Sequence, residues 1–171
     1  MFRSKVARLG LMIVFAGAGC GDNLPEAITP PFHSRVEGTR QLDMLTPEES
    51  DTFCQDFKAH SSDFVHRPRI VEGGCRLRVD QSAPSCEQMK SECIAELSMK
   101  PHDPKCPQWS PPCESTVADF ERCWTATEWF LAQFFLAIPD CGSTDVSFDV
   151  EAAGAVRRAE CAAYFDGCPG G

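Results

Sequence analysis

Cysteine is the residue type that most constrains how this chain of 171 residues can fold. The sequence contains eleven cysteines, an odd number. Cysteines in an exported protein usually pair as disulfides, so an odd count leaves one sulfur that needs another role. Removing Cys20 leaves an even set, which we expect to form five disulfides: Cys54, Cys75, Cys86, Cys93, Cys106, Cys113, Cys123, Cys141, Cys161 and Cys168.

Residues 1–19 have the three-part composition of a secretory signal peptide. Three basic residues are followed by an apolar run and then by small residues. The apolar run is too short to span a bilayer. The segment ends at Gly17-Ala18-Gly19-Cys20. It resembles a bacterial lipoprotein signal, although that family usually has leucine where Gly17 stands. The alternative is an ordinary cleaved signal, with Cys20 either paired or free.

The resemblance carries several implications for the mature protein. In that family the cysteine becomes the first mature residue and carries the lipid, which here implies fatty acylation, including palmitate, on Cys20. The chain would then be anchored to the membrane of the cell envelope through this lipid. Gly21 stands where an Asp would retain such a protein at the inner membrane, so the resemblance favours the outer membrane.

Residues 20–44 are expected to join the lipid to a folded domain that spans residues 45–171. The segment is rich in proline and glycine and shows neither a helical nor an alternating pattern, which is typical of a flexible tether. An extended arm that lies on the domain through Phe32 is the alternative.

The stretch between Cys113 and Cys141 predicts the central helix of the domain. Thr116 and Asp119 form a capping-box motif, and Ile138-Pro139 ends the helix. Apolar residues occupy nearly all of its circumference, which indicates a helix in the middle of a bundle. In its second half only three residues are left for solvent, namely Glu128, Ala132 and Gln133.

Three further helices are predicted by similar signals. One begins at the capping box of Thr46-Pro47-Glu48-Glu49, one runs from Ser85 to Met99, and one runs from Ser147 or Asp149 to Gly167. Residues 70–80 contain Gly73-Gly74 and alternate, which favours a short hairpin or a disulfide-tied loop. Residues 101–112 contain five prolines and form an irregular loop. The predicted fold is a single all-α domain, a small disulfide-stapled bundle of about four helices.

Helix geometry restricts the disulfide pairing. Cys86 and Cys93 lie on one face of their helix, so each should bond to another element rather than to its neighbour. If that helix and the central helix are antiparallel neighbours, Cys93 and Cys123 lie at the same height, which makes them the favoured pair. Cys123 and Cys141 are separated by roughly 25 Å of helix, well beyond the reach of a disulfide.

The net charge argues against nucleic acid as a partner. The chain has 16 basic and 25 acidic residues, and loss of the signal peptide leaves 13 basic residues and a net charge of −12. Such a chain is repelled by nucleic acids and by anionic lipid head groups. Solubility explains this acidity, and a basic partner or a shell of cations is the alternative.

Catalytic and metal-binding motifs are missing from the sequence. It has no C-x-x-C pair, no G-x-S-x-G elbow and no glycine-rich phosphate loop. His33, His60, His66 and His102 are scattered, which indicates exposed polar residues rather than metal ligands. We therefore predict no cofactor, no metal and no enzymatic activity. The alternative is a hydrolase, in which one of the last three histidines would lie within hydrogen-bond reach of a Ser or Asp.

The sequence as a whole resembles the uncharacterised cysteine-rich lipoproteins of myxobacteria. The residues that carry the resemblance are Cys20, the helix start from Thr46 to Cys54, and Cys113 to Cys123. We expect a membrane-anchored, non-catalytic binding or structural module with an unknown protein or ligand as partner. The alternative is a carrier or sensor of a small apolar ligand, held in a helical cavity lined by aromatic residues: Trp124, Trp129, Phe130, Phe134 and Phe135.

Overall fold

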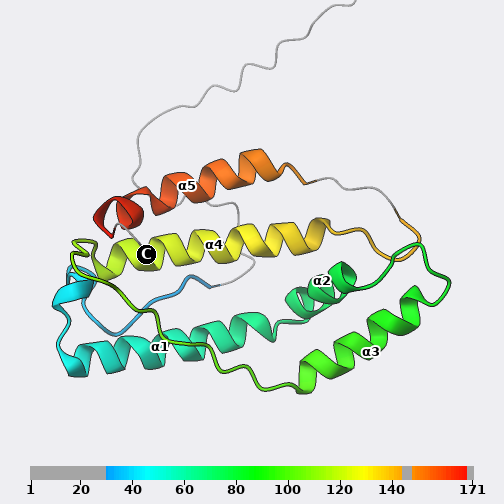
Figure 1. Ribbon diagram of the computed structural model, residues 1–171, viewed down its shortest axis with the longest axis horizontal. Helices are drawn as coiled ribbons and strands as arrows, with labels where there is room; N and C mark the ends of the chain where they lie inside the picture. Colours follow the sequence, from blue (N-terminus) through cyan, green and yellow to red (C-terminus); the bar gives the residue numbers. More distant parts are fainter. Residues whose placement is uncertain (1–29, 144–147, 169–171) are drawn as a thin grey trace, which may run out of the picture.

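The computed structural model describes residues 30–143 and 148–168, and within these ranges the protein is helical with no β-strand (Figure 1). Cys20 and the predicted signal peptide lie outside the described residues. The elements are a 3₁₀ turn, Leu42–Met44, and five α-helices: α1 (Pro47–Val65), α2 (Pro68–Arg78), α3 (Cys86–Met99), α4 (Val117–Ala137) and α5 (Val150–Gly167). The all-α, disulfide-stapled fold is confirmed, with one helix more than predicted. None of these helices is both long enough and apolar enough to cross a membrane.

The predicted helix starts are confirmed. Three of them depend on a cap between residues that are only three positions apart. Thr46 and Glu49 form a complete capping box at the start of α1, and Thr116 and Asp119 form another at the start of α4. At the start of α5 the side chain of Asp149 accepts a hydrogen bond from the backbone N–H of Ala152. These contacts satisfy N–H groups that the first turn of a helix leaves without partners.

The prediction for residues 70–80 is wrong, because all of this segment up to Arg78 belongs to helix α2. Pro68 occupies the first turn of α2, where its missing N–H costs nothing. Gly73 does not form a turn. It allows α2 to lie directly against α4, since a Cβ at this position would overlap the Cβ of Phe135. Close packing of two helices, rather than a hairpin, explains this glycine.

Helix α4 runs through the centre of the molecule, with α5 along one side and α1 and α2 along the other (Figure 1). Its Phe120 is the hub of the core. The ring of Phe120 lies 5.2–6.2 Å, centroid to centroid, from the rings of six other residues: Phe32, Phe53, Phe57, Trp109, Trp124 and Tyr164. Most of these pairs are edge-to-face, the arrangement that aromatic quadrupoles favour.

Helices α1 and α4 run in the same direction (Figure 1). Residues that contact each other across the two helices are therefore separated by a constant number of positions in the sequence. Phe53 of α1 meets Phe120 of α4, and Phe57 meets Trp124, an offset of 67 residues in both cases. These ring contacts form a seam that joins α1 and α4 through their side chains. One further ring lies between the two helices.

That further ring is Phe32, which belongs to an arm formed by residues 30–44. Phe32 is 1% exposed and Leu42 2% exposed. The backbone N–H of Phe32 donates to Thr125 of α4, and the N–H of Arg35 donates to Asp56 of α1. The prediction of a flexible tether up to residue 44 is therefore wrong for this part, and the alternative of an arm lying on the domain through Phe32 is correct. Burial of an aromatic ring outweighs the loop-like composition.

Five disulfides pair all ten cysteines that follow Cys20, as the count predicts. The pairs are Cys54–Cys106, Cys75–Cys93, Cys86–Cys141, Cys113–Cys168 and Cys123–Cys161.

The specific prediction of a Cys93–Cys123 bond is wrong. It assumed that α3 and α4 are neighbours, whereas α3 packs on α2 and bonds to Cys75 there. Cys123 instead bonds across the long α4–α5 contact. The outward bonding of Cys86 and Cys93 and the exclusion of a Cys123–Cys141 bond are both confirmed.

Candidate functional site

The most deeply buried charged side chain of the described residues is Glu128 of α4, which is 1% exposed. Its carboxylate oxygens lie 2.7 Å from Trp124 Nε1, which donates to it from one turn earlier, and 2.7 Å from His60 Nε2 of α1. The expectation that Glu128 faces solvent is wrong, as is the expectation that His60 is an exposed polar residue. A buried carboxylate requires such partners, because leaving it without hydrogen bonds in a dry interior is costly.

The arm completes the surroundings of this buried pair. The ring of Phe32 lies 5.2 Å from the imidazole of His60. The side chain of His60 is 15% exposed, so its ring reaches the edge of the core while Glu128 lies within it. Sequence periodicity could not find this pair, because the two residues are separated by 68 positions in the chain.

The other histidines contact different groups. His33 lies on the surface, 3.5 Å from the carboxylate of Glu121. The ring nitrogens of His66 lie within hydrogen-bond distance of the carbonyls of Ser62 and Lys100, which raises the pKa of His66, with the Lys100 carbonyl as the main cause. His102 is exposed. In the described ranges, none of these rings is hydrogen-bonded to a Ser or Asp side chain, the contact that the hydrolase alternative requires.

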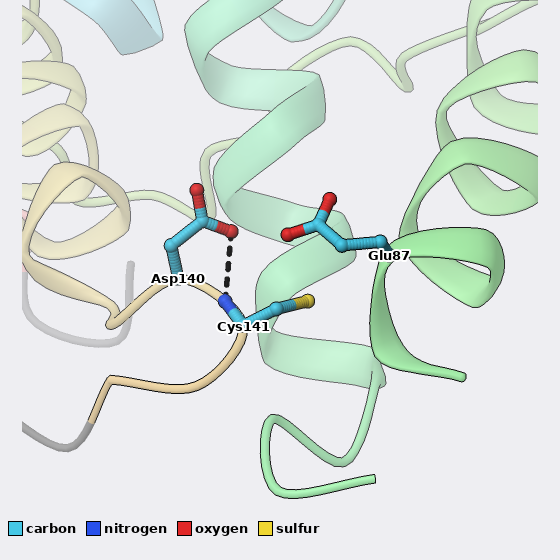
Figure 2. A group of neighbouring side chains, drawn as sticks. All are labelled: Glu87, Asp140 and Cys141. Carbon is cyan, nitrogen blue, oxygen red and sulfur yellow. Dashed lines mark hydrogen bonds between the residues drawn. The ribbon is translucent and has the colours of Figure 1, made fainter. Parts of the chain in front are cut away.

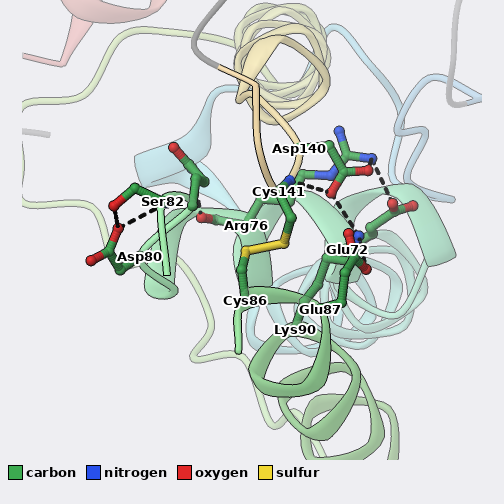
Figure 3. The surroundings of a disulfide bond; sticks show 10 residues. Glu72, Arg76, Asp80, Ser82, Cys86, Glu87, Lys90, Asp140 and Cys141 are labelled. Carbon is green, nitrogen blue, oxygen red and sulfur yellow. Dashed lines mark hydrogen bonds and ion pairs between the residues drawn. A yellow bond between two sulfur atoms is a disulfide. The ribbon is translucent and has the colours of Figure 1, made fainter. Parts of the chain in front are cut away.

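A second polar group lies where α2, α3 and the segment after α4 meet, around the Cys86–Cys141 disulfide (Figure 3). Lys90 Nζ lies 2.6 Å from Asp140 and 2.9 Å from Glu87. Arg76 lies 3.3 Å from the same Asp140 carboxylate. Helices α2 and α3 are thus joined to each other, and to a segment 50–64 residues later in the sequence, by charge as well as by sulfur.

These contacts shift the protonation of two of the groups. The hydrogen bond from Lys90, followed by the one from the backbone N–H of Cys141, lowers the pKa of Asp140. The same carboxylate, followed by that of Glu87, raises the pKa of Lys90. Both shifts favour the charged forms, so the ion pair persists over a wider pH range than two isolated groups would.

The donor atoms of Glu87, Asp140 and Cys141 lie within 4.8 Å of one another, the spacing of a metal site (Figure 2). The chemistry of the donors does not fit a metal. The sulfur of Cys141 is bonded to Cys86, so it cannot act as a thiolate, and both carboxylates are already paired with Lys90. A cation would have to displace an ammonium group that is 12% exposed. The group is best described as an ion-pair cluster.

Four of the five aromatic residues of the carrier hypothesis pack against other rings or side chains: Trp124, Phe130, Phe134 and Phe135. Trp124 stacks on Phe120 in the core. Phe130 and Phe134, farther along α4, both contact the ring of Phe148. Phe135 belongs to a second, smaller cluster around Phe64, Ile70 and Ala132. These rings therefore contact other rings and side chains of the same chain, which is the usual role of aromatic residues in a core.

Comparisons with known proteins leave the function open. No protein-family model matches the chain, and no curated protein or solved structure matches it significantly.

Proposed function

We propose that this chain is an exported lipoprotein, anchored to the membrane of the cell envelope through lipid on Cys20, whose disulfide-stapled helical domain acts as a non-catalytic binding or structural module. The signal-like composition of residues 1–19 and the position of Cys20 directly after it motivate the proposal. The outer membrane is the proposed location, because Gly21 follows the lipidated residue.

One observation gives the proposal most of its support. All ten cysteines after Cys20 are used in disulfides with one another. No cysteine of the chain is therefore left to pair with Cys20. A single unpaired sulfur directly after a signal peptide is the group that lipid attachment uses, and five disulfides are typical of a protein from an oxidising compartment.

The domain itself supports a binding or structural role. Its polar clusters consist of paired charges that hold helices together, and its buried carboxylate is satisfied by Trp124 and His60. Groups held in this way are arranged for stability. A partner would therefore be recognised by the outer surface of the domain, which carries a net negative charge.

The experiment that tests the anchor is a Cys20→Ser substitution in the full chain, expressed in a bacterial host that exports it. We expect the wild-type chain in the membrane fraction, labelled by a clickable palmitate analogue. The variant should lose the label and either move to the soluble fraction or accumulate unprocessed. Gly17→Leu, which restores the usual lipoprotein pattern but keeps the sulfur, is the matched control and should retain the label.

Unchanged membrane association of the Cys20→Ser variant would refute the proposal. Two or more acyl chains make membrane attachment stable where one is marginal, so the expected change between fractions is large.

A further inference from the structure

The five disulfides differ in how well the fold protects them. Four of them have at least one cysteine that is almost completely buried: Cys75 at 0%, Cys86 at 2%, Cys113 at 0% and Cys161 at 0%. In the fifth, Cys54–Cys106, both cysteines are partly exposed. A thiolate must reach a sulfur atom along the S–S axis to attack it, so access is a primary determinant of exchange.

The bridge from Cys54 to Cys106 holds the proline-rich loop, residues 101–112, against α1. Near the bridge, Lys58 Nζ lies 2.9 Å from the carboxylate of Asp103, a further contact between α1 and this loop. Both groups of that ion pair are well exposed, and exposed pairs contribute little to stability. Of these two contacts, the disulfide is therefore the stronger.

The loop also covers part of the core. The ring of Trp109 lies 5.3 Å from that of Phe53, the residue before Cys54, and 6.0 Å from that of Phe120. Release of the loop would withdraw this indole and uncover the end of the aromatic core. Opening of the Cys54–Cys106 bridge together with release of the loop would therefore expose an apolar surface.

We propose that Cys54–Cys106 is a site of thiol–disulfide exchange, opened by a dithiol reductant, and that its opening releases the proline-rich loop while the other four disulfides hold the fold. One thiolate of the dithiol attacks a sulfur of the bridge, forming a mixed disulfide and expelling the other cysteine as a thiolate. The second thiol of the reductant then displaces the first cysteine and closes its own disulfide. Two electrons pass to the bridge, and its two sulfurs end as thiols. The proposal is independent of the lipid on Cys20.

The test uses dithiothreitol as the probe on the full chain, recovered oxidised from expressing cells. Samples taken during a titration are alkylated with N-ethylmaleimide and mapped by mass spectrometry of peptides. We expect Cys54 and Cys106 to be labelled together at least tenfold faster than the other eight cysteines of the disulfide set. Helical circular dichroism should remain while this first pair reacts.

Two results would overturn the proposal. One is that another pair, such as Cys75–Cys93, which also has one partly exposed end, reacts first. The other is that all ten cysteines react together with loss of helix, since this would show that the bridge opens only by global unfolding.

Release of the loop has its own readout. Opening the bridge should shift tryptophan fluorescence to the red in the wild type, and Trp109→Phe should abolish that shift while leaving the alkylation pattern unchanged. A Cys54→Ser/Cys106→Ser variant should show the shifted fluorescence without reductant. Selective labelling of the first pair with no fluorescence change would disprove the coupling to the loop.

Discussion

His60 Nε2 and Glu128 Oε2 lie 2.7 Å apart across the parallel seam of α1 and α4, and the carboxylate is almost completely hidden from water. This contact is the polar continuation of a seam that is otherwise aromatic. It places a charge in the core at the point where the arm, through Phe32, also contacts the histidine ring.

Removal of the imidazole should therefore destabilise the domain strongly. We expect His60→Ala to lower the free energy of unfolding by about 3–5 kcal/mol, because it leaves the Glu128 carboxylate buried with one partner fewer. Urea denaturation of the oxidised protein measures this. The matched control is His33→Ala, which removes a 72% exposed histidine from a second His–Glu pair and should cost at most about 1 kcal/mol. Equal losses in the two variants would show that burial does not distinguish the pairs.

The adjacent glycines of α2 should respond to alanine with opposite signs. At Gly73 an added Cβ would collide with Phe135, so Gly73→Ala should destabilise the domain by about 1–3 kcal/mol. At Gly74 nothing lies within 4 Å, so Gly74→Ala should stabilise it by about 0.5–1 kcal/mol through helix propensity. The midpoint of urea denaturation reports both changes. A stabilising Gly73→Ala would contradict the close packing of α2 on α4.

The ion-pair cluster predicts a specific dependence of stability on pH. The folded pKa of Asp140 lies below its usual value of 3.8, chiefly because of the hydrogen bond from Lys90. Its contribution is therefore fully present above the unfolded pKa and is lost as the pH falls through the folded pKa. Lys90 stays charged throughout this range, since its pKa is raised.

We accordingly expect Asp140→Asn to be less stable than the wild type at pH 6 and to approach it as the pH falls toward 2. The measurement is the difference in unfolding free energy between the two proteins from pH 6 to pH 2, because other acidic groups, such as Glu49, titrate in both. A difference that is constant over this range would refute the role of the Asp140 charge.

Two substitutions in the arm test whether Phe32 is buried in the core. Phe32→Ala should cost about 3–5 kcal/mol, because it deletes a ring that is packed among Phe53, Phe57 and Phe120. Substitution of the exposed neighbour Pro31 by Ala should change the unfolding free energy by less than about 0.5 kcal/mol. If both substitutions were neutral, residues 30–44 would behave as the tether that their composition suggests.

The sequence predicted what local rules determine. Helix starts such as Thr116–Asp119 were found because a capping box involves residues three positions apart. The number of disulfides followed from a count, whereas their partners depend on which helices are neighbours. The Cys93–Cys123 prediction failed because α3 packs on α2.

The remaining errors have the same origin. Helical periodicity predicts that Glu128 faces solvent, because it shows a face of the helix but not the histidine that meets this face from another helix. Proline and glycine content predicts a tether for the arm, because composition is local, while the burial of Phe32 depends on rings up to 88 positions away in the sequence. For the same reason the sequence did not predict the His60–Glu128 pair or the ion-pair cluster, since both join residues that are distant in the chain.

The arm also sets the order in which the molecule can be completed. The backbone of Phe32 bonds to Thr125, a separation of 93 residues. A ribosome synthesises the chain from its N-terminus, so the arm is made early but has no finished place to settle until α4 has followed it. Closing so wide a loop is slow compared with forming a helix. The aromatic interior around Phe32 therefore cannot be completed before α4 has been synthesised.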